Sequence, residues 1–351
     1  MTDRRELLEA LSVRMEGLPA SERTRLVAYF EDMIDDRLAA GMDEAAAVSA
    51  LGDVDALLRD ALPEMRPGID QTGAAHCDEP VREIHIHLKN ADAVLRREPL
   101  PGGMTAQINA SEGGRFTWHL AEGVLSIGEV AEARRRLFRP DAKLEVILPE
   151  MNPDALIADS YGGDIEVEGI VPGERAVLAS SSGDIRLKEF GCRGRLEITV
   201  RSGDIELNKV EAAADCKLES VSGDIGLREV RAASLRVRTA SGDVEGRAIR
   251  ADAIALGATS GDIEMEDVEA GGTLLCETTA GDVEMIRAAA AEVRASSKSG
   301  DIRLALSHRP GGYAIRAASA GGDVRVSGDD PDGGAQVLAQ SADGDIHVSV
   351  E

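Results

Sequence analysis

The chain has 351 residues, 37 of them glycine, and a formal net charge of −25 at pH 7. This acidic balance argues against direct binding to nucleic acid or to an anionic membrane surface, and it favours solubility or a basic partner. No apolar run approaches the roughly 18 residues that span a bilayer, and the charged start is unlike a signal peptide, so we expect a cytoplasmic protein.

Residues 1–62 have the apolar periodicity of a small helical bundle. Leu7 and Leu11 mark one amphipathic helix, and Phe30 and Ile34 mark a second. The second helix also carries a row of carboxylates, formed by Glu31, Asp32, Asp35 and Asp36. This row is either a solvated surface or a docking surface for a basic partner.

Residues 63–79 are expected to form a linker, because Pro63, Pro67, Gly68 and Gly73 would break any helix. The two halves of the chain are therefore expected to be separate domains.

Residues 80–150 show irregular strand patterns, such as the alternation of Ile84, Ile86 and Leu88. We expect this region to be a β-rich cap at the N-terminal end of the repeats that follow, because a bare sheet edge would attract other chains. His85 and His87 lie on the outward face of one predicted strand. A His-x-His pair can bind zinc, and exposed strand histidines are the alternative interpretation.

A short basic run interrupts the same region, at Arg134, Arg135, Arg136 and Arg139. In so acidic a chain this run is better explained as a solvated loop, or as a partner for the chain's own carboxylates, than as a nucleic-acid contact.

Residues 151–351 are dominated by a repeat. Ten Gly-Asp dipeptides occur at steps of 19 to 22 residues, from Gly163-Asp164 to Gly344-Asp345, and each Asp is followed by Ile or Val. With each Asp as position 0, positions +1 and +3 are mostly apolar, and positions −8 and −6 are apolar or small. Two half-buried strands per coil would thus face one core. The sequence predicts a mainly β fold, a two-sheet β-solenoid of about ten 20-residue coils.

The Gly-Asp dipeptides are expected to be turns, in which glycine supplies a positive φ and the Asp side chain bonds nearby backbone donors. The clearest turn residues are Gly183, Asp184, Gly203, Asp204, Gly223, Asp224, Gly242, Asp243, Gly261 and Asp262.

A column of stacked carboxylates could also attract a cation, which makes Asp184, Asp204, Asp224, Asp243 and Asp262 candidate metal ligands. Calcium takes six to eight oxygens, and the calcium-binding nonapeptide repeat has a much shorter period, so turn formation is the preferred interpretation. No cofactor is predicted.

The late repeats depart from the pattern at Gly246, at Ala280, and in the longer spacings around Asp323 and Asp345. These departures are interpreted as tapering toward a terminal cap. A separate hypothesis is that the last coil, which ends at Glu351, is unprotected and allows the solenoid to self-associate end to end or edge to edge.

The four cysteines do not suggest a disulfide framework, because no two of them occupy one column of adjacent coils. Small buried hydrophobic residues are the better interpretation of Cys77, Cys192, Cys216 and Cys276.

Two segments carry a resemblance to known families. The runs at 29–36, 41–46 and 51–55 resemble the bacterial HAAS signalling domain, which implies a signalling role and a protein partner such as a PadR-type transcriptional regulator. The Ser-Gly-Asp-Ile coils, with the β-rich stretch ending at 144–149, resemble the bacterial putative-adhesin family of β-strand repeats, whose function is unknown.

The residues do not favour an enzyme. The sequence contains no nucleophile elbow, no phosphate-cradling loop and no metalloprotease helix. A carbohydrate-active β-helix is the enzyme alternative, but Trp118 is the only tryptophan, whereas sugar-binding grooves usually offer aromatic platforms. We therefore expect a regulatory adaptor whose helices bind a protein and whose acidic solenoid displays a surface. The alternative is a self-assembling or adhesin-like scaffold.

Overall fold

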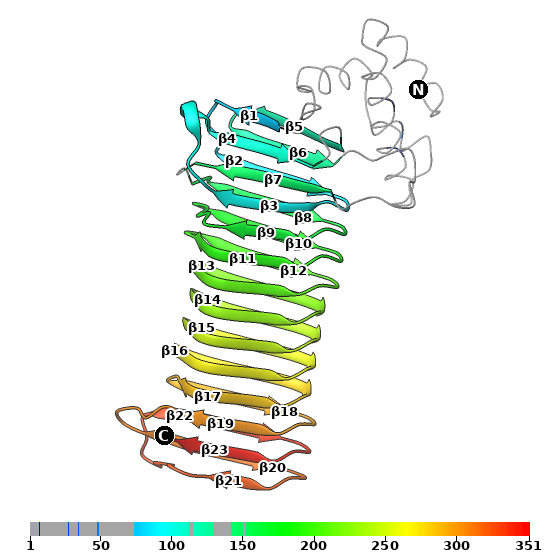
Figure 1. Ribbon diagram of the computed structural model, residues 1–351. Coiled ribbons are helices and arrows are strands. Elements are labelled where there is room, and N and C mark those ends of the chain that lie inside the picture. Colours follow the sequence, from blue (N-terminus) through cyan, green and yellow to red (C-terminus); the bar gives the residue numbers. More distant parts are fainter. Residues whose placement is uncertain are drawn as a thin grey trace, which may run out of the picture. The chain divides into compact units, whose positions relative to one another are not determined.

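The computed structural model describes four stretches of the second part of the chain and four single residues before them: 74–111, 115–129, 142–149 and 152–351, with Leu7, Val27, Ile34 and Val48 (Figure 1). The chain divides into two compact units, Met1–Pro67 and Gly68–Glu351. In the first unit the four described residues are helical.

Several predicted features lie outside the described residues. They are Glu31, Asp32, Asp35 and Asp36, nearly all of the predicted helices, residues 63–73 of the linker, and the arginines at 134–136 and 139.

The second unit is built from strands, joined by short turns. Its N-terminal strands are β1 (Ala74–Cys77), β2 (Glu83–Leu88), β3 (Asp92–Arg97), β4 (Ala106–Ala110), β5 (Phe116–Ala121), β6 (Val124–Glu129) and β7 (Lys143–Leu148), with a 3-10 turn at Pro101–Gly103. The middle strands are β8 (Ala155–Ser160), β9 (Ile165–Glu168), β10 (Arg175–Ser180), β11 (Ile185–Cys192), β12 (Arg195–Val200), β13 (Ile205–Ser222), β14 (Ile225–Ser241), β15 (Val244–Ser260) and β16 (Ile263–Ala280). The last strands are β17 (Val283–Ala289), β18 (Glu292–Ser297), β19 (Ile302–Leu306), β20 (Tyr313–Ser319), β21 (Val324–Val326), β22 (Ala335–Ser341) and β23 (Ile346–Val350).

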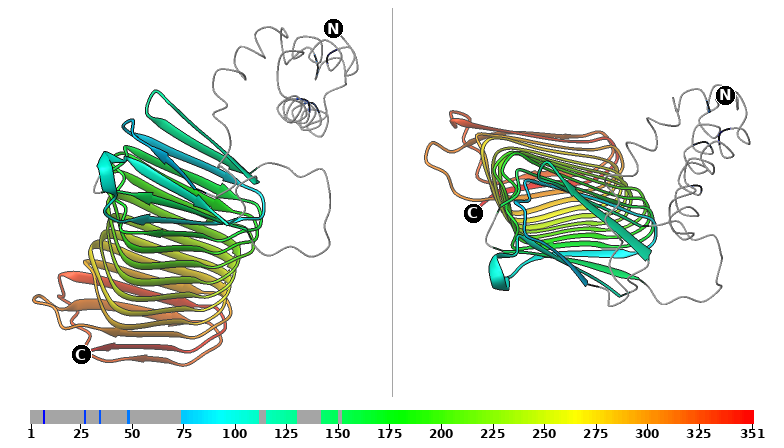
Figure 2. Two further views of the ribbon diagram at one scale, coloured as in Figure 1. Left: turned by 45° about the horizontal axis from the view of Figure 1, so that its top comes forward. Right: turned by 90° about the horizontal axis from the view of Figure 1, so that it is seen from above.

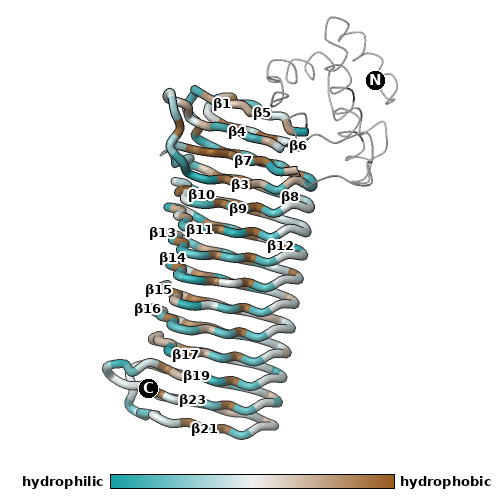
Figure 3. Tube along the Cα trace, viewed as in Figure 1, coloured by the Kyte–Doolittle hydropathy of each residue, from teal (hydrophilic) through white to brown (hydrophobic). Residues whose placement is uncertain are grey.

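The predicted β-solenoid is confirmed. Strands of successive coils pair in parallel, so that Ile205 lies beside Ile185 on one side and Ile225 on the other. Viewed from above in Figure 2, the coils form nested loops around one interior. Apolar and polar residues alternate along each coil, as the brown and teal bands of Figure 3 show.

The core is filled from both predicted strands of each coil. Ile205 and Leu207, at positions +1 and +3, are buried, as are Cys216 and Leu218 at positions −8 and −6 before the next Asp. Because the inner coils repeat this arrangement, with Gly246 as an exception at position +3, the core continues without a break through them.

Each middle coil contains one bend that the pattern did not predict, at position +5. Lys209, Glu229 and Ala248 have φ values of 56°, 53° and 58° there, in the left-handed region that ordinary residues avoid. The bend turns the following residues inward, so that Val210 at position +6 is fully buried. A third short segment, from +6 to +8, therefore lines the core beside the two predicted strands. Gly169, with a φ of 71°, occupies the same position in an earlier coil and was a signal for this bend in the sequence.

The N-terminal end of the stack is closed by antiparallel strands. The coil formed by β2 and β3 lies between the coil of β6 and β7 and the coil of β8 and β9. Outside the β6–β7 coil, β4 pairs antiparallel with β7, β1 with β4, and β5 with β6. Residues 74–77, which the sequence assigned to the linker, thus form a strand, because Cys77 is buried and the segment pairs with β4.

The C-terminal coils do not stack in chain order. The coil of β22 and β23 pairs with β18 and β19 on one side and with β20 and β21 on the other. The prediction that the last coil is an unprotected edge was therefore wrong, because Val348 is fully buried between two coils. The outermost coil is the one before it in sequence, with Asp323 at its corner, and β21 is the lowest strand in Figure 1.

The tapering interpretation of Gly246 was also wrong. This glycine lies in β15, in the middle of the stack, and not near an end. A Cβ at Gly246 would lie 2.3 Å from Met265 Sδ, so the methionine of the next coil fills the core space that Gly246 leaves.

Candidate functional site

The Gly-Asp corners form a hydrogen-bonded column along the stack. The backbone N–H of Asp184 donates to Asp164 Oδ1 at 2.9 Å, and the N–H of Asp204 donates to Asp184 Oδ1 at 2.9 Å. The same contact links each coil to the next along the whole column: Asp92, Asp164, Asp184, Asp204, Asp224, Asp243, Asp262, Asp282, Asp301, Asp345 and Asp323. Each Asp of the column except the terminal Asp323 thus accepts a backbone donor, as expected, but the donor belongs to the next coil and not to its own turn.

The glycines of these corners are needed for a different reason from the predicted one. None of Gly183, Gly203 and Gly223 has a positive φ. A Cβ at Gly223 would instead lie 2.0 Å from the carbonyl oxygen of Gly203, and a Cβ at Gly203 would lie 2.5 Å from that of Gly183. Stacked backbones approach too closely here for any side chain.

Hydroxyl side chains at position −4 close the turns themselves. Ser160 Oγ and Ser180 Oγ accept the backbone N–H of Gly163 and Gly183, at 2.9 and 2.8 Å. In later coils the hydroxyl donates along the stack, as Thr278 Oγ1 does to the Gly261 carbonyl at 3.2 Å. Most coils carry Ser or Thr at position −4, four residues before the Asp of the corner.

The candidate metal ligands are engaged in the column. Asp184 Oδ1 accepts a backbone N–H. Its Oδ2 accepts a hydrogen bond from the Arg186 guanidinium at 2.5 Å, and the same guanidinium also donates to Asp164. His85 and His87 do not converge on one point, because each contacts its own carboxylate, Glu83 and Asp159 respectively. Within the described part of the chain, no three His, Cys, Asp or Glu residues are placed to hold a metal ion.

The outward side chains form charged rows along the stack. Residues at equal positions of successive coils pair, such as Lys209 with Glu189 at 3.3 Å and Arg231 with Glu211 at 3.2 Å. Such exposed pairs contribute little to stability individually. Where the row is acidic only, burial and the neighbouring Glu245 raise the pKa of Glu264. The outer surface of the solenoid therefore carries charged side chains that repeat from coil to coil, at the distance between neighbouring strands.

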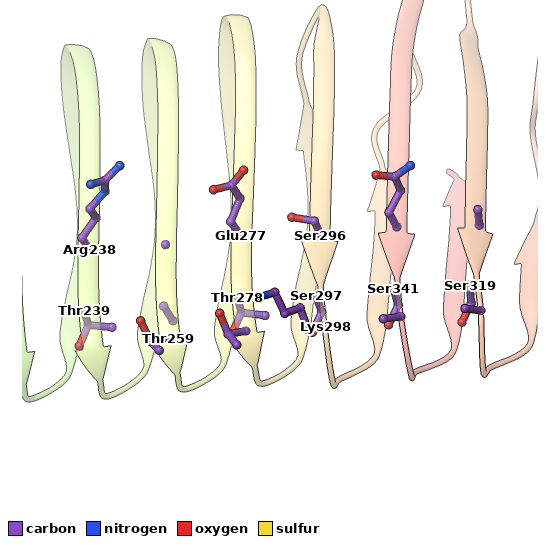
Figure 4. Close-up of a pocket in the computed structure, with 17 residues that line it drawn as sticks. Arg238, Thr239, Thr259, Glu277, Thr278, Ser296, Ser297, Lys298, Ser319 and Ser341 are labelled. Carbon is purple, nitrogen blue, oxygen red and sulfur yellow. The ribbon is translucent and has the colours of Figure 1, made fainter.

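A shallow hollow of about 870 Å³ lies across the later coils, at the strand ends before the Gly-Asp corner (Figure 4). Figure 4 shows Thr239, Thr278 and Ser297 in line on separate coils, with Arg238 and Glu277 beside them. The hollow exists because small residues meet at these positions, including Gly257, Ala258, Ala318, Ala320 and Ala342. None of its lining residues is aromatic, so it lacks the stacking platforms of a sugar-binding groove.

The cysteines are free and buried in the structure. Burial raises the pKa of the Cys216 thiol to about 12 and also raises that of Cys276. Because the thiolate is the reactive form, these residues are core side chains and not nucleophiles.

The capped N-terminal end holds one carboxylate with an unusual set of partners. Glu129 Oε2 accepts the backbone N–H groups of Lys89, Asn90 and Ala91 at 2.7, 2.8 and 3.1 Å, and Arg115 Nε donates to its Oε1 at 2.7 Å. Burial alone would raise the pKa of Glu129, but these hydrogen bonds outweigh it and lower the pKa. This carboxylate joins the cap to the first turn of the stack.

Comparison with known proteins gives two family matches. The family described as Toastrack DUF4097 matches residues 117–311 and 235–351, and the HAAS family matches residues 8–60. Both predicted resemblances are thereby confirmed. A search of curated proteins gave no match.

Two solved structures resemble the chain at low sequence identity. A putative adhesin from Bacteroides fragilis NCTC 9343 is 11% identical, with 79% of this chain and 95% of that chain covered and a TM-score of 0.39. A putative cell adhesion protein from Clostridium sporogenes ATCC 15579 is also 11% identical, with 79% and 98% covered and a TM-score of 0.22.

None of the described helical residues belongs to a helix long and apolar enough to cross a membrane.

Proposed function

The chain belongs to the Toastrack DUF4097 family, and from this membership together with its HAAS segment we propose that it is a cytoplasmic regulatory adaptor without enzymatic activity. In this proposal the N-terminal unit binds a protein partner, and the acidic solenoid is a rigid body that displays a second surface.

The observation that carries the proposal is the division of the chain into two compact units with different character. The HAAS match falls entirely within the first unit, Met1–Pro67, and the solenoid occupies the second. The solenoid's polar groups pair repeatedly with one another along the stack, as the Asp column does, and no three His, Cys, Asp or Glu residues among its described residues are placed to hold a catalytic metal. Such a surface suits binding better than catalysis.

The chemistry of the first unit suggests the nature of its partner. Glu31, Asp32, Asp35 and Asp36 put four carboxylates into six residues. Such a row would attract a basic surface and speed its association. We propose that the partner is a PadR-type transcriptional regulator, so that the acidic chain acts on transcription through the regulator and not by binding DNA.

Affinity capture from native extract, with identification by mass spectrometry, tests this proposal. The full chain is expected to recover a DNA-binding regulator, and a variant with Glu31→Lys, Asp32→Lys, Asp35→Lys and Asp36→Lys is expected to lose it. The matched control reverses four solenoid carboxylates, the exposed Glu189→Lys, Glu211→Lys and Glu269→Lys and the half-buried Glu168→Lys, and keeps the regulator.

Two results would contradict the adaptor proposal. One is the absence of any regulator among the proteins that the full chain recovers. The other is loss of the regulator in the solenoid variant while the N-terminal variant still binds it.

A further inference from the structure

The outermost C-terminal coil has an open strand edge. Among the described residues, β21 pairs only with β23. The Asp323 carbonyl accepts the N–H of Ile346 at 2.8 Å, and the N–H of Ser327 donates to Val348 O at 2.9 Å, so these residues direct their backbone groups toward β23. Because backbone groups alternate sides along a strand, the N–H and C=O of Val324 and Val326 face away from the stack.

This edge also exposes apolar side chains that are buried in every inner coil. Val324 and Val326 are each 41% exposed, whereas the equivalent residues of the neighbouring coil, Ile346 and Val348, are 1% and 0% exposed. The difference arises because no further coil covers positions +1 and +3 of the outermost coil.

The strand next to it in the same coil is already protected. The N–H of Ile315 in β20 donates to Asp329 Oδ1 at 2.8 Å, and the N–H of Asp330 donates to the Tyr313 carbonyl at 2.9 Å. The segment that contains Asp329 and Asp330 thus covers part of the β20 edge, which leaves β21 as the open strand of this end. Proteins usually block such an edge or use it for pairing.

We propose that β21 pairs with β21 of a second copy of this chain, antiparallel, about a two-fold axis at Val324. This register makes the two Val324 residues a hydrogen-bonded pair, which uses their outward N–H and C=O groups. It also places Asp323 opposite Arg325 of the partner subunit, and the partner subunit's Asp323 opposite Arg325, so that two ion pairs form.

Charge selects this register over its neighbour. An axis at Arg325 would place the two arginines directly opposite each other, which is unfavourable. Asp323 is available for the pairing because it is the last carboxylate of the column, and no N–H of a further coil donates to it among the described residues.

The assembly stops at two copies. The pairing occupies the β21 edge of both copies, and the opposite end of the stack carries the antiparallel strands β1, β4 and β5 in place of a further parallel coil. A two-fold interface joins like surfaces and closes on itself, unlike a head-to-tail contact, which would extend into a fibre.

Sedimentation velocity of the full chain over a range of concentrations tests this inference. The wild-type protein is expected to form a dimer that reaches twice the mass of one chain and grows no further. Asp323→Arg alone and Arg325→Asp alone are each expected to raise the dimer dissociation constant by at least ~10-fold, because like charges then face each other across the axis. The double variant, Asp323→Arg with Arg325→Asp, restores both ion pairs and is expected to dimerise again.

A control variant, Arg231→Glu, reverses an exposed charge on the side of the stack and should leave the dimer unchanged. Thermal unfolding of each variant checks that the coils remain folded. A wild-type monomer at all concentrations would overturn the inference, as would growth beyond the dimer or a dimer insensitive to both single reversals. The inference stands apart from the adaptor proposal, because its outcome does not depend on residues 31–36 or on any partner protein.

Discussion

Close backbone contact, and not left-handed conformation, explains the glycine of each Gly-Asp corner. We expect Gly223→Ala to destabilise the protein by at least ~2 kcal/mol, because its Cβ would lie 2.0 Å from the Gly203 carbonyl oxygen. Gly226→Ala is the matched control in the same coil, since a Cβ there meets no atom within 4 Å. Thermal unfolding of the two variants measures the difference. Equal midpoints would contradict the contact explanation.

Glu129 makes the stability of the N-terminal cap depend on pH, with stability lost at low pH. Its pKa is lowered in the folded protein, so the stabilisation from the ionised carboxylate is complete above its ordinary pKa of about 4.5 and is lost as the pH falls through the folded value. We expect Glu129→Gln to lower stability by about 2 kcal/mol near neutral pH, through weaker bonds to three backbone donors.

Unfolding of the wild type and the Glu129→Gln variant at a series of pH values measures this dependence. The difference between them is expected to shrink as the pH falls below about 4.5. Glu122→Gln, at an exposed position beside the same cap, serves as the control. A difference that stays constant down to low pH would show that the charge of Glu129 does not matter.

At the scale of elements, the strands that alternate strictly were predictable. Apolar residues at +1 and +3 and at −8 and −6 fixed two core-facing segments per coil, and the structure has both. The bend at +5 could not be read from the same pattern, because most of its residues, such as Glu189 and Lys209, are ordinary charged residues held at positive φ by the coils on either side. Only Gly169 marked the position in the sequence.

The order of the end coils could not be predicted either. A repeat pattern says which residues face the core, but stacking order depends on contacts between distant segments, such as β18 with β22. The hollow in Figure 4 was missed for a related reason, since its small residues become neighbours only once the later coils are stacked in their actual order.

The bend should be a place where glycine stabilises the fold. Ala248 has a φ of 58°, a conformation that costs an L-residue roughly 1–2 kcal/mol. Glycine adopts this conformation without that cost, but it loses about 0.5–1 kcal/mol more conformational entropy than alanine on folding. Ala248→Gly is therefore expected to raise the unfolding midpoint slightly. Ala253→Gly, in the same strand without a positive φ, is expected to lower it. If both substitutions shift the unfolding midpoint in the same direction, backbone strain at the bend is contradicted.

At the scale of the whole molecule, the solenoid is a one-dimensional stack whose two ends have different structures. Antiparallel strands close the N-terminal end, and the C-terminal end keeps β21 open. Between the ends, each coil satisfies its neighbours' backbone groups and fills a continuous core, so the stack behaves as one rigid element. Such an element suits the display of a surface, while the HAAS segment of the other unit supplies the proposed contact with a regulator.

Hydrogen exchange of the full chain, with and without a purified PadR-type regulator, tests this division of roles most directly. The adaptor account predicts that the regulator slows exchange within residues 8–60, which match the HAAS family, and leaves the solenoid coils unchanged. Protection along the coils with none in residues 8–60, or no change anywhere at saturating regulator, would contradict it.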